Sequence, residues 1–376
     1  MIVFNRPYMT GQELDNIANA HAAGHLAGDG TYTQYCHEWL ERRTGANRAL
    51  LTHSCTAALE MAALLVGLGP GDEVIMPSFT FVSTANAVVL RGAVPVFVDV
   101  RGDTFNLDER IIEQAITERT KAIYVVHYAG VAAEMEAILR IAEDYGLMVV
   151  EDAAQAVMSS YRGQPLGSLG HLGAFSFHET KNVISGEGGA LLCRDEEFVE
   201  RAEILREKGT DRSRFFRGQV DKYSWVDVGS SYLPAEVTAA FLAAQLDAAD
   251  EITRRRLAIW SEYHQWAEGW EKGGSIVRPV VPEDRSHNGH MYYLVLPSLE
   301  ARSRFLSELR QQDVMAVFHY VPLHATRAGR RFGRVAGEMT QTERAGECLV
   351  RMPLWVGLEA HLPRVLEAAD RALGGL

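Results

Sequence analysis

Two residues of this sequence have the chemistry of a covalent cofactor site. Lys181 follows a strand-like run of small and aromatic residues, Gly173–Thr180, and precedes the glycine turn Ser185–Gly189. Upstream, Asp152 ends a second strand-like run, Val149–Asp152. A lysine amine can form a Schiff base with an aldehyde, and an aspartate can pair with a pyridinium nitrogen. Because both residues follow strands, the pattern predicts pyridoxal phosphate (PLP) as the cofactor, with Lys181 and Asp152 as catalytic residues.

Each of these residues, taken alone, has a plainer interpretation as a loop lysine or a helix cap, so the neighbouring motifs matter. Thr52–Ala57 leads directly into a predicted helix. Ser54 or Thr56 can cap this helix, and the free backbone N–H groups at a helix start attract phosphate. An ordinary helix cap would use the same residues. The lysine and aspartate downstream favour a phosphate site.

Aromatic and amide side chains could hold the ring of such a cofactor. Pro77–Phe81 closes a strand, so Phe79 or Phe81 could lie on the ring, although aromatic residues after strands more often belong to the core. Gln155 lies one helical turn beyond Asp152 and could hydrogen-bond the ring hydroxyl. The Asp152 carboxylate would keep the ring nitrogen protonated, and a protonated ring withdraws electrons from the substrate.

A basic segment follows, at residues 206–222, and it contains Lys208 and Arg212, with Tyr223 next in the chain. The whole chain has a formal net charge of −12, from 37 basic and 49 acidic residues, which disfavours broad binding of nucleic acid. The segment therefore suits a small phosphorylated ligand. A solvated loop of the same composition is the alternative.

Several other classes of protein have no support in the sequence. The four cysteines form no CxxC pair, and His319 and His324 lack the spacing and the glutamate of a zinc-binding HExxH motif, so no metal site is predicted. No run approaches the ~18 apolar residues of a membrane helix, and the polar start is no signal peptide, so we expect a cytoplasmic protein. Gly67–Gly71 precedes a strand, which disfavours a nicotinamide dehydrogenase.

The elements that position these residues alternate between helix and strand from about residue 50 to residue 205. Such alternation predicts an α/β fold with a mainly parallel sheet and helices on both faces. Ligands of open α/β sheets lie beyond the carboxyl ends of the strands, where Pro77–Phe81, His127–Gly130 and Asp152–Gln155 are expected. The expected strands are Glu73–Met76, Pro95–Val100, Lys121–Val126, Leu147–Glu151, Phe175–Phe177 and Ala190–Cys193. The expected helices are Thr56–Val66, Ser83–Leu90, Glu109–Ile116, Ala133–Asp144 and Phe198–Lys208.

The pattern changes after about residue 249. Glu251–Trp270 is predicted to form one long helix between two domains, with a solvated cluster of arginines at 254–256. Beyond it, the strands Met291–Leu296 and Ala316–Tyr320 flank the helix Ser303–Gln312, which indicates a smaller α+β unit. A chain of 376 residues accommodates two domains. We expect a large PLP-binding domain at 1–249 and a small C-terminal domain at 250–376.

The order of these motifs resembles that of the DegT/StrS family of nucleotide-sugar aminotransferases, which have PLP fold type I (aspartate aminotransferase-like). The resemblance covers most of the chain. The matching segments are Gly71–Ser78, Glu151–Gln155, Phe175–Asn182, Gly186–Gly189 and His319–His324. Arg206–Thr210, Phe215–Tyr223 and Ser230–Tyr232 resemble the subgroup that makes dTDP-4-amino-4,6-dideoxygalactose.

The resemblance implies a set of site residues and a homodimer with shared active sites. It assigns Lys181 to the Schiff base, Asp152 to the ring nitrogen, Phe79 to the ring face and Gln155 to the ring hydroxyl. The expected cofactor residues are Ser54, Cys55, Thr56, Phe79, Asp152, Gln155, Ser176, Lys181 and, from the neighbouring subunit, Ser231. The expected substrate residues are Lys208, Arg212, Tyr223, His319, Tyr320 and His324. Cys55 stands where the family commonly has glycine, and Ser231 where it has asparagine.

The implied reaction is PLP-dependent transamination of dTDP-4-keto-6-deoxy-D-glucose to dTDP-4-amino-4,6-dideoxy-D-galactose, with glutamate as the amino donor. The alternative product is the gluco epimer of a secondary-metabolite pathway. A PLP-dependent sugar dehydratase of the family would have histidine in place of Lys181, and a non-catalytic regulator would have lost Lys181 or Asp152. The expected partners are the sugar nucleotide and an amino acid, with neither nucleic acid nor membrane.

Overall fold

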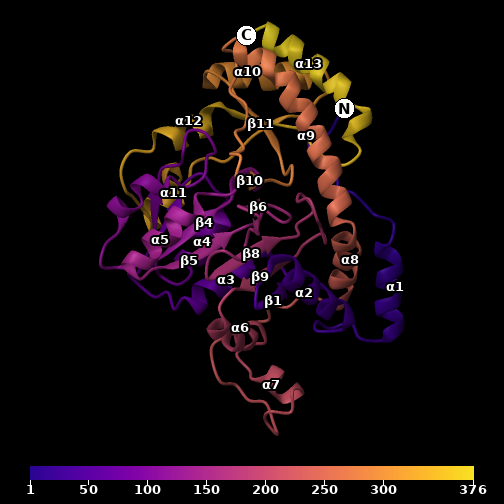
Figure 1. Cartoon of the computed structure of the whole chain (residues 1–376), viewed down its shortest axis with the longest axis vertical. Coiled ribbons are helices and arrows are strands. Elements are labelled where there is room, and N and C mark those ends of the chain that lie inside the picture. The colour runs from indigo at the N-terminus through magenta and orange to yellow at the C-terminus, as the bar shows by residue number, and fades with distance from the viewer.

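An eight-stranded sheet forms the centre of the larger part of the computed structural model, which describes residues 1–376 (Figure 1). The strand order across the sheet is β1-β9-β8-β5-β4-β2-β3-β13. The bounds are β1 Arg48–Thr52, β2 Glu73–Pro77, β3 Val94–Val98, β4 Thr120–Val126, β5 Met148–Asp152, β8 Leu172–Ser176, β9 Gly189–Cys193 and β13 Arg334–Val335.

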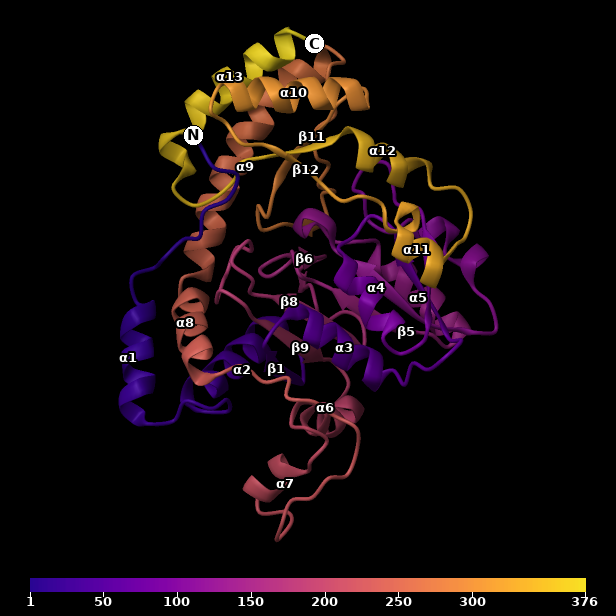
Figure 2. The same cartoon turned by 180° about the vertical axis from the view of Figure 1, so that it is seen from behind.

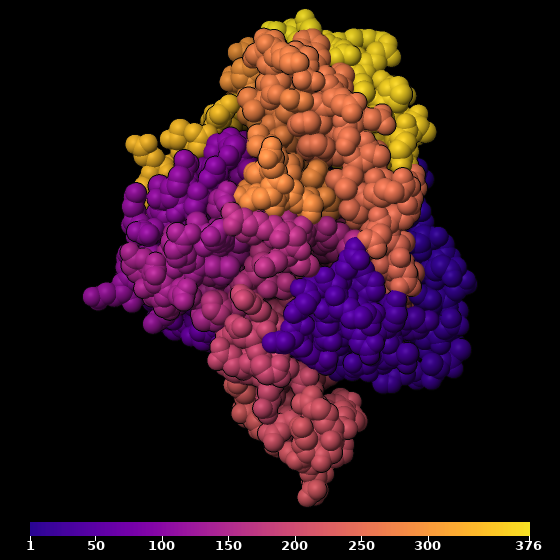
Figure 3. All heavy atoms as spheres, viewed as in Figure 1, coloured from indigo at the N-terminus to yellow at the C-terminus, as the bar shows by residue number.

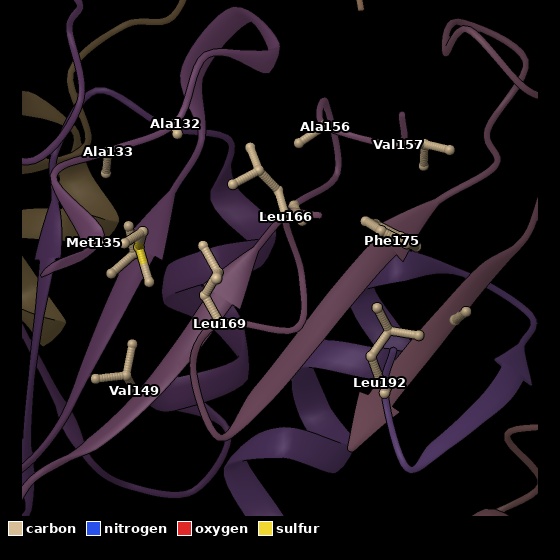
Figure 4. Packing of buried hydrophobic residues seen from close by; sticks show 14 of the residues in the cluster. Ala132, Ala133, Met135, Val149, Ala156, Val157, Leu166, Leu169, Phe175 and Leu192 are labelled. Carbon is tan, nitrogen blue, oxygen red and sulfur yellow. The ribbon is translucent and has the colours of Figure 1, made fainter. Parts of the chain in front are cut away.

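Buried side chains on the two faces of this sheet form separate clusters. Consecutive residues of a strand point to opposite faces, so Val149 joins one cluster and Val150 the other. Figure 4 shows the first face, where Phe175 and Leu192 from neighbouring strands lie near Leu166. Helices α2 (Thr31–Thr44), α5 (Met135–Tyr145) and α8 (Glu236–Asp247) cover this face, and α3 (Cys55–Leu65), α4 (Val82–Val89) and α6 (Val199–Arg206) cover the other.

The expected parallel sheet is present, with one exception. β3, β2, β4, β5 and β8 pair in parallel, but β9 runs antiparallel to both β8 and β1. A parallel neighbour needs a crossover connection, usually a helix. The segment between Ser176 and Gly189 contains no helix, so the chain turns back directly and β9 is antiparallel. This turn contains Lys181.

The helix predicted at Glu109–Ile116 is wrong. The structure has two short 3₁₀ turns there, η1 (Glu109–Ile111) and η2 (Glu113–Ala115). Ile112 and Ala115 are the fully buried apolar residues of this segment, and they are three positions apart. Side chains at i and i+3 lie on one line in a 3₁₀ helix, so this spacing fits the tighter turn as well as it fits an α-helix.

One long helix, α9 (Ala249–Lys272), connects the large sheet to a smaller unit, as predicted. The smaller unit has a three-stranded antiparallel sheet in the order β11-β14-β12 (Tyr292–Val295, Leu349–Met352 and Val317–Phe318). Helices α10 (Leu299–Gln311) and α13 (Leu362–Gly374) lie over this sheet at the upper end of the molecule (Figure 2). None of the helices combines the length and the apolarity needed to span a membrane.

Two segments cross the predicted domain boundary at residue 249. Ile2 forms a parallel bridge with Val314 and packs in the small unit, while β13 pairs with β3 at the edge of the large sheet. The remaining α-helices and strands are α1 (Glu13–Ala23), α7 (Arg212–Phe216), α11 (Arg327–Phe332), α12 (Thr340–Cys348), β6 (Ser160–Tyr161), β7 (Gln164–Pro165) and β10 (Arg285–Ser286). The segment around α7 protrudes from the rest of the molecule (Figure 3).

Candidate active site

A cavity of about 790 Å³ lies at the carboxyl ends of the strands and extends to the small unit. Val126, Asp152 and Ser176 are the last residues of β4, β5 and β8, and all three line it. Ser54 enters from the segment after β1, and Lys181 from the turn after β8. The sheet thus brings the predicted lysine, carboxylate and phosphate segment to one place, as the rule for open α/β sheets anticipates.

Asp152 and Lys181 are the two groups of this cavity that are best suited to bind and activate a cofactor. Thr84 donates its hydroxyl to Asp152 Oδ2 at 2.6 Å, and the Ala154 N–H donates to Oδ1 at 3.2 Å. Burial raises the pKa of Asp152, which the positive charge of Lys181 opposes. Burial lowers the pKa of Lys181. A positively charged ring between these groups would compensate the buried carboxylate, so the pair fits a pyridinium cofactor.

The start of helix α3, which the sequence predicts to bind phosphate, lines one end of the cavity. Ser54 caps the helix by accepting a hydrogen bond from the Ala57 N–H at 3.1 Å, and Cys55 and Thr56 line the cavity beside it. Gly189 of β9 passes so close that a Cβ atom there would lie 2.4 Å from the Cys55 nitrogen. Free N–H groups at a capped helix start suit a phosphate group. Cys55 in place of the usual glycine leaves this arrangement intact.

The position of Phe79 contradicts the prediction that it faces a cofactor ring. Its side chain is fully buried, and its ring centroid lies 5.2 Å from that of Tyr128 and 5.5 Å from that of Tyr320. Phe81 lines the cavity and is 56% exposed. The sequence could not show which of Phe79 and Phe81 faces the cavity, because the aromatic partners of Phe79 come from distant segments of the chain.

Gln155 forms another wall of the cavity with His319 and Tyr320 of the small unit. The Ala129 N–H donates to Gln155 Oε1 at 2.7 Å, and Gln155 Nε2 donates to the Tyr320 hydroxyl at 3.1 Å. His319 Nδ1 lies 2.8 Å from the Tyr128 hydroxyl, and burial holds the pKa of His319 well below its ordinary value. This wall is uncharged, and it links the large sheet to the small unit across the cavity.

The other predicted substrate residues do not line this cavity, and neither does Ser231, the cofactor residue predicted to come from the neighbouring subunit. Ser78 Oγ is 2.8 Å from His324 Nδ1, so His324 ties the small unit to the end of β2 instead. Lys208, Arg212 and Ser231 line a second cavity of about 300 Å³. Tyr223 is 52% exposed on the protruding segment. Within one subunit, these four residues are therefore separated from Lys181.

Several cavity residues were missed by the sequence analysis: Phe4, Asn5, Arg256, His290 and Arg351. The prediction of a solvated cluster is wrong for Arg256, which is buried and donates to the backbone oxygens of Gly289 and His290 at 3.1 and 2.7 Å. The helical spacing of the sequence could have indicated this burial, because Arg256 shares a helix face with Ile252 and Ile259, which are fully buried. Arg351 had no such signal, since a short strand does not show which of its residues reaches a cavity.

Comparisons with known proteins identify the family of this chain. The model of the DegT/DnrJ/EryC1/StrS aminotransferase family matches residues 7–369. The UDP-4-amino-4-deoxy-L-arabinose–oxoglutarate aminotransferase of Shewanella sediminis is 32% identical, over 98% of this chain and 97% of its own length.

Solved structures agree as well. The aminotransferase TlmJ from Streptoalloteichus hindustanus is 30% identical with a TM-score of 0.91, covering 100% of this chain and 99% of that chain. The PLP form of the sugar aminotransferase Spr1654 from Streptococcus pneumoniae is 26% identical with a TM-score of 0.91. The match covers 100% of this chain and 99% of that chain. The chain therefore belongs to the DegT/DnrJ/EryC1/StrS family and is a PLP-dependent sugar aminotransferase of fold type I.

Proposed function

We propose that the protein aminates C4 of dTDP-4-keto-6-deoxy-D-glucose, with glutamate as the amino donor, to give dTDP-4-amino-4,6-dideoxy-D-galactose. The observation that carries the transamination is the convergence of Lys181, Asp152 and the start of α3 on one cavity. Its volume of about 790 Å³ is in the range of cavities that hold a cofactor with a substrate.

The residues of the cavity would divide the work of this reaction. Bound PLP supplies an aldehyde for the Lys181 amine and a ring that withdraws electrons. Asp152, fixed by Thr84 and Ala154, holds the proton on the ring nitrogen. Ser54, Cys55, Thr56 and Ser176 hold the phosphate, and Phe81 covers the ring face in place of Phe79.

Lys181 has a second task, the movement of a proton. Burial lowers the pKa of its amine, so less free energy is needed to deprotonate Nζ than for an exposed lysine. The neutral Nζ would then accept a proton at the reacting centre and hold it for return, which is the role of a general base. His319 and Tyr320 line the same cavity, and their rings stack with centroids 3.5 Å apart.

Amination at C4 and the glutamate donor are supported by the Shewanella relative, whose name gives a 4-amino sugar and oxoglutarate, the keto acid of glutamate. The dTDP nucleotide and the galacto configuration rest on the sequence resemblance of residues 206–223. The alternative is the gluco epimer, formed if the sugar presents its other face. That change needs a rotation of the sugar and no change in a catalytic residue.

The test is incubation of the PLP-loaded protein with dTDP-4-keto-6-deoxyglucose and L-glutamate, followed by NMR of the product. We expect an amine at C4 and a small H3–H4 coupling, which marks the axial nitrogen of the galacto product. A large coupling would establish the gluco epimer instead. Amination of a 3-keto sugar with the 4-keto sugar inert would overturn the regiochemistry, and Lys181→Ala serves as the inactive control.

A further inference from the structure

We propose that His290 accepts a hydrogen bond from the C3 hydroxyl of the nucleotide sugar, an inference that rests on the proposed function. His290 lines the same cavity as Lys181 and Asp152, and it lies two residues before β11 begins. Its contacts with the rest of the chain decide which ring nitrogen is free to bind a ligand and whether this nitrogen carries a hydrogen.

Two neighbouring side chains hold His290 in place. Arg256 of α9 donates to the backbone oxygens of Gly289 and His290 at 3.1 and 2.7 Å. On the other side, the ring nitrogen Nδ1 of His290 lies 3.0 Å from Asn182 Oδ1. Asn182 is buried and follows Lys181 directly in the chain. The ring is therefore fixed both to the long helix and to the turn that contains the lysine.

Asn182 determines the tautomer of His290. The Nδ2 atom of Asn182 donates to the Asn288 backbone oxygen at 2.8 Å, so its Oδ1 is the atom that meets His290. Because Oδ1 can only accept, Nδ1 of His290 must carry the hydrogen. Burial, together with the positive charges of Lys181 and Arg256, holds the pKa of His290 well below its ordinary value. The ring is therefore neutral at pH 7, and Nε2 has a free lone pair.

This Nε2 atom has no partner within the chain. It forms no hydrogen bond there, and it is not enclosed by protein, unlike the unpartnered Nδ1 atoms of His37 and His264. Since His290 lines the cavity, Nε2 is open to the molecules that the cavity holds. A nitrogen lone pair binds a hydrogen-bond donor and repels groups that can only accept.

The ligands of the reaction offer few suitable donors. The ionised carboxylates of glutamate only accept, and so do the phosphates of the cofactor and the nucleotide. The ring hydroxyl of the cofactor is expected at Gln155. The proposed sugar has free hydroxyls at C2 and C3, and the C3 hydroxyl is next to the ketone that must react near Lys181. The C3 hydroxyl is therefore the donor that fits this acceptor.

The first test needs no variant. Wild-type holoenzyme should aminate dTDP-4-keto-6-deoxyglucose with a kcat/KM about 10- to 100-fold above that for the same sugar without its C3 hydroxyl, because the analogue leaves Nε2 unpaired. The analogue without the C2 hydroxyl should lose less than about threefold, since it keeps this hydrogen bond. Equal kcat/KM values with and without the C3 hydroxyl would overturn the inference. A larger loss for the C2 analogue would overturn it too.

Two variants assign the preference to His290. His290→Asn can keep the bond to Asn182 through its amide nitrogen but lacks an acceptor at the position of Nε2, so its preference for the C3 hydroxyl should fall below about threefold. His290→Gln reaches that position with its amide oxygen and should retain part of the preference. His21→Asn, which changes an exposed histidine of α1, is the matched control. The reaction of the cofactor with L-glutamate, measured by absorbance without any sugar, should change less than about twofold in all three.

Thermal unfolding verifies that each variant is folded, and the wild-type comparison of sugars decides the matter if His290→Asn does not fold. A folded His290→Asn that keeps the full preference would contradict the inference. An equal loss in the reaction with glutamate would do so as well, because His290 would then act on Lys181 and not on the sugar. A wild-type protein that aminates none of these sugars refutes the proposed function itself, and the role of His290 with it.

Discussion

At the scale of single residues, the site places an amine and a carboxylate in one buried cavity without a direct ion pair between them. Burial moves the pKa of Lys181 down and that of Asp152 up, so each charge is less favourable than it would be in water. Thr84 and Ala154 hold the Asp152 carboxylate in place. A protonated ring nitrogen is the partner that would satisfy it, so the function of Asp152 should depend on its charge.

We therefore expect Asp152→Asn to slow transamination by about three orders of magnitude, which corresponds to about 4 kcal/mol of barrier. The amide has nearly the same shape and can still accept from Thr84, but it cannot hold the proton on the ring nitrogen. Single-turnover kinetics with L-glutamate would measure the loss, with the PLP content of the variant as a control. Rates within tenfold of wild type would contradict a role for the charge.

At the scale of elements, strand β5 carries two consecutive carboxylates that point to opposite sides. Asp152 faces the cavity, and Glu151 is fully buried below it. Glu151 accepts from the N–H groups of Gly167, Leu169 and Gly170 at 2.8, 2.6 and 2.6 Å, and from His127 Nε2 at 2.8 Å. The Ala133 N–H donates to His127 Nδ1, so the hydrogen of this ring is on Nε2. Glu151 thus joins β5 to the loop before β8.

Glu151→Gln should lower the free energy of unfolding at pH 7 by about 3 kcal/mol, since the amide presents a donor to groups that are themselves donors. Burial alone would raise the pKa of Glu151, but the hydrogen bonds from His127, Gly170 and Gly167 outweigh it and lower the pKa. A lowered folded-state pKa stabilises the protein above the unfolded-state pKa, and this stabilisation is lost as the pH falls through the folded-state value.

The free energy of unfolding of the wild type should accordingly fall more steeply in acid than that of Glu151→Gln. The two plots of unfolding free energy against pH should therefore converge as the pH falls. Urea denaturation between about pH 3 and pH 7 would measure both, with the exposed Glu118→Gln as the matched control. Parallel plots for wild type and Glu151→Gln would show that protonation of Glu151 does not affect the stability of the fold.

At the scale of the whole molecule, the protruding segment separates the predicted nucleotide-binding residues from Lys181 within one subunit. It exposes Phe216 and Trp225, which are 69% and 81% accessible. Exposed aromatic side chains on a protrusion are typical of a surface that contacts another protein. We propose that they meet a second copy of the chain, which would bring Lys208 and Arg212 to the partner's cavity in a symmetric homodimer.

Mixing two inactive variants would test this arrangement. Lys181→Ala lacks the catalytic amine, and the double variant Lys208→Ala/Arg212→Ala lacks the basic residues of the protrusion. Random mixing makes about half of the dimers hybrid, each with one intact site, so activity should return to about a quarter of wild type. The Lys181→Ala protein alone is the baseline. Activity that stays at this baseline, or full wild-type activity in a monomer by sedimentation, would contradict the shared site.

The sequence by itself determined the alternation of the large sheet and the long helix α9, and it placed Lys181, Asp152 and the start of α3 after strands, where they can converge on one site. These features depend on local periodicity and on the rule that parallel strands end at one edge, and both can be read along the chain. The cap at Ser54 is equally local, since the side chain binds a backbone group three residues away.

Only the tertiary structure decided which side chains reach the cavity. Phe79 and Phe81 are equivalent in sequence, but Tyr128 and Tyr320 enclose Phe79 and leave Phe81 exposed. Arg351 of the small sheet lines the same cavity as Lys181 of the large domain, and no local pattern specifies how the two parts of the chain meet. Burial and charge at a site depend on segments far apart in the chain, so they are properties of the folded molecule and not of any motif.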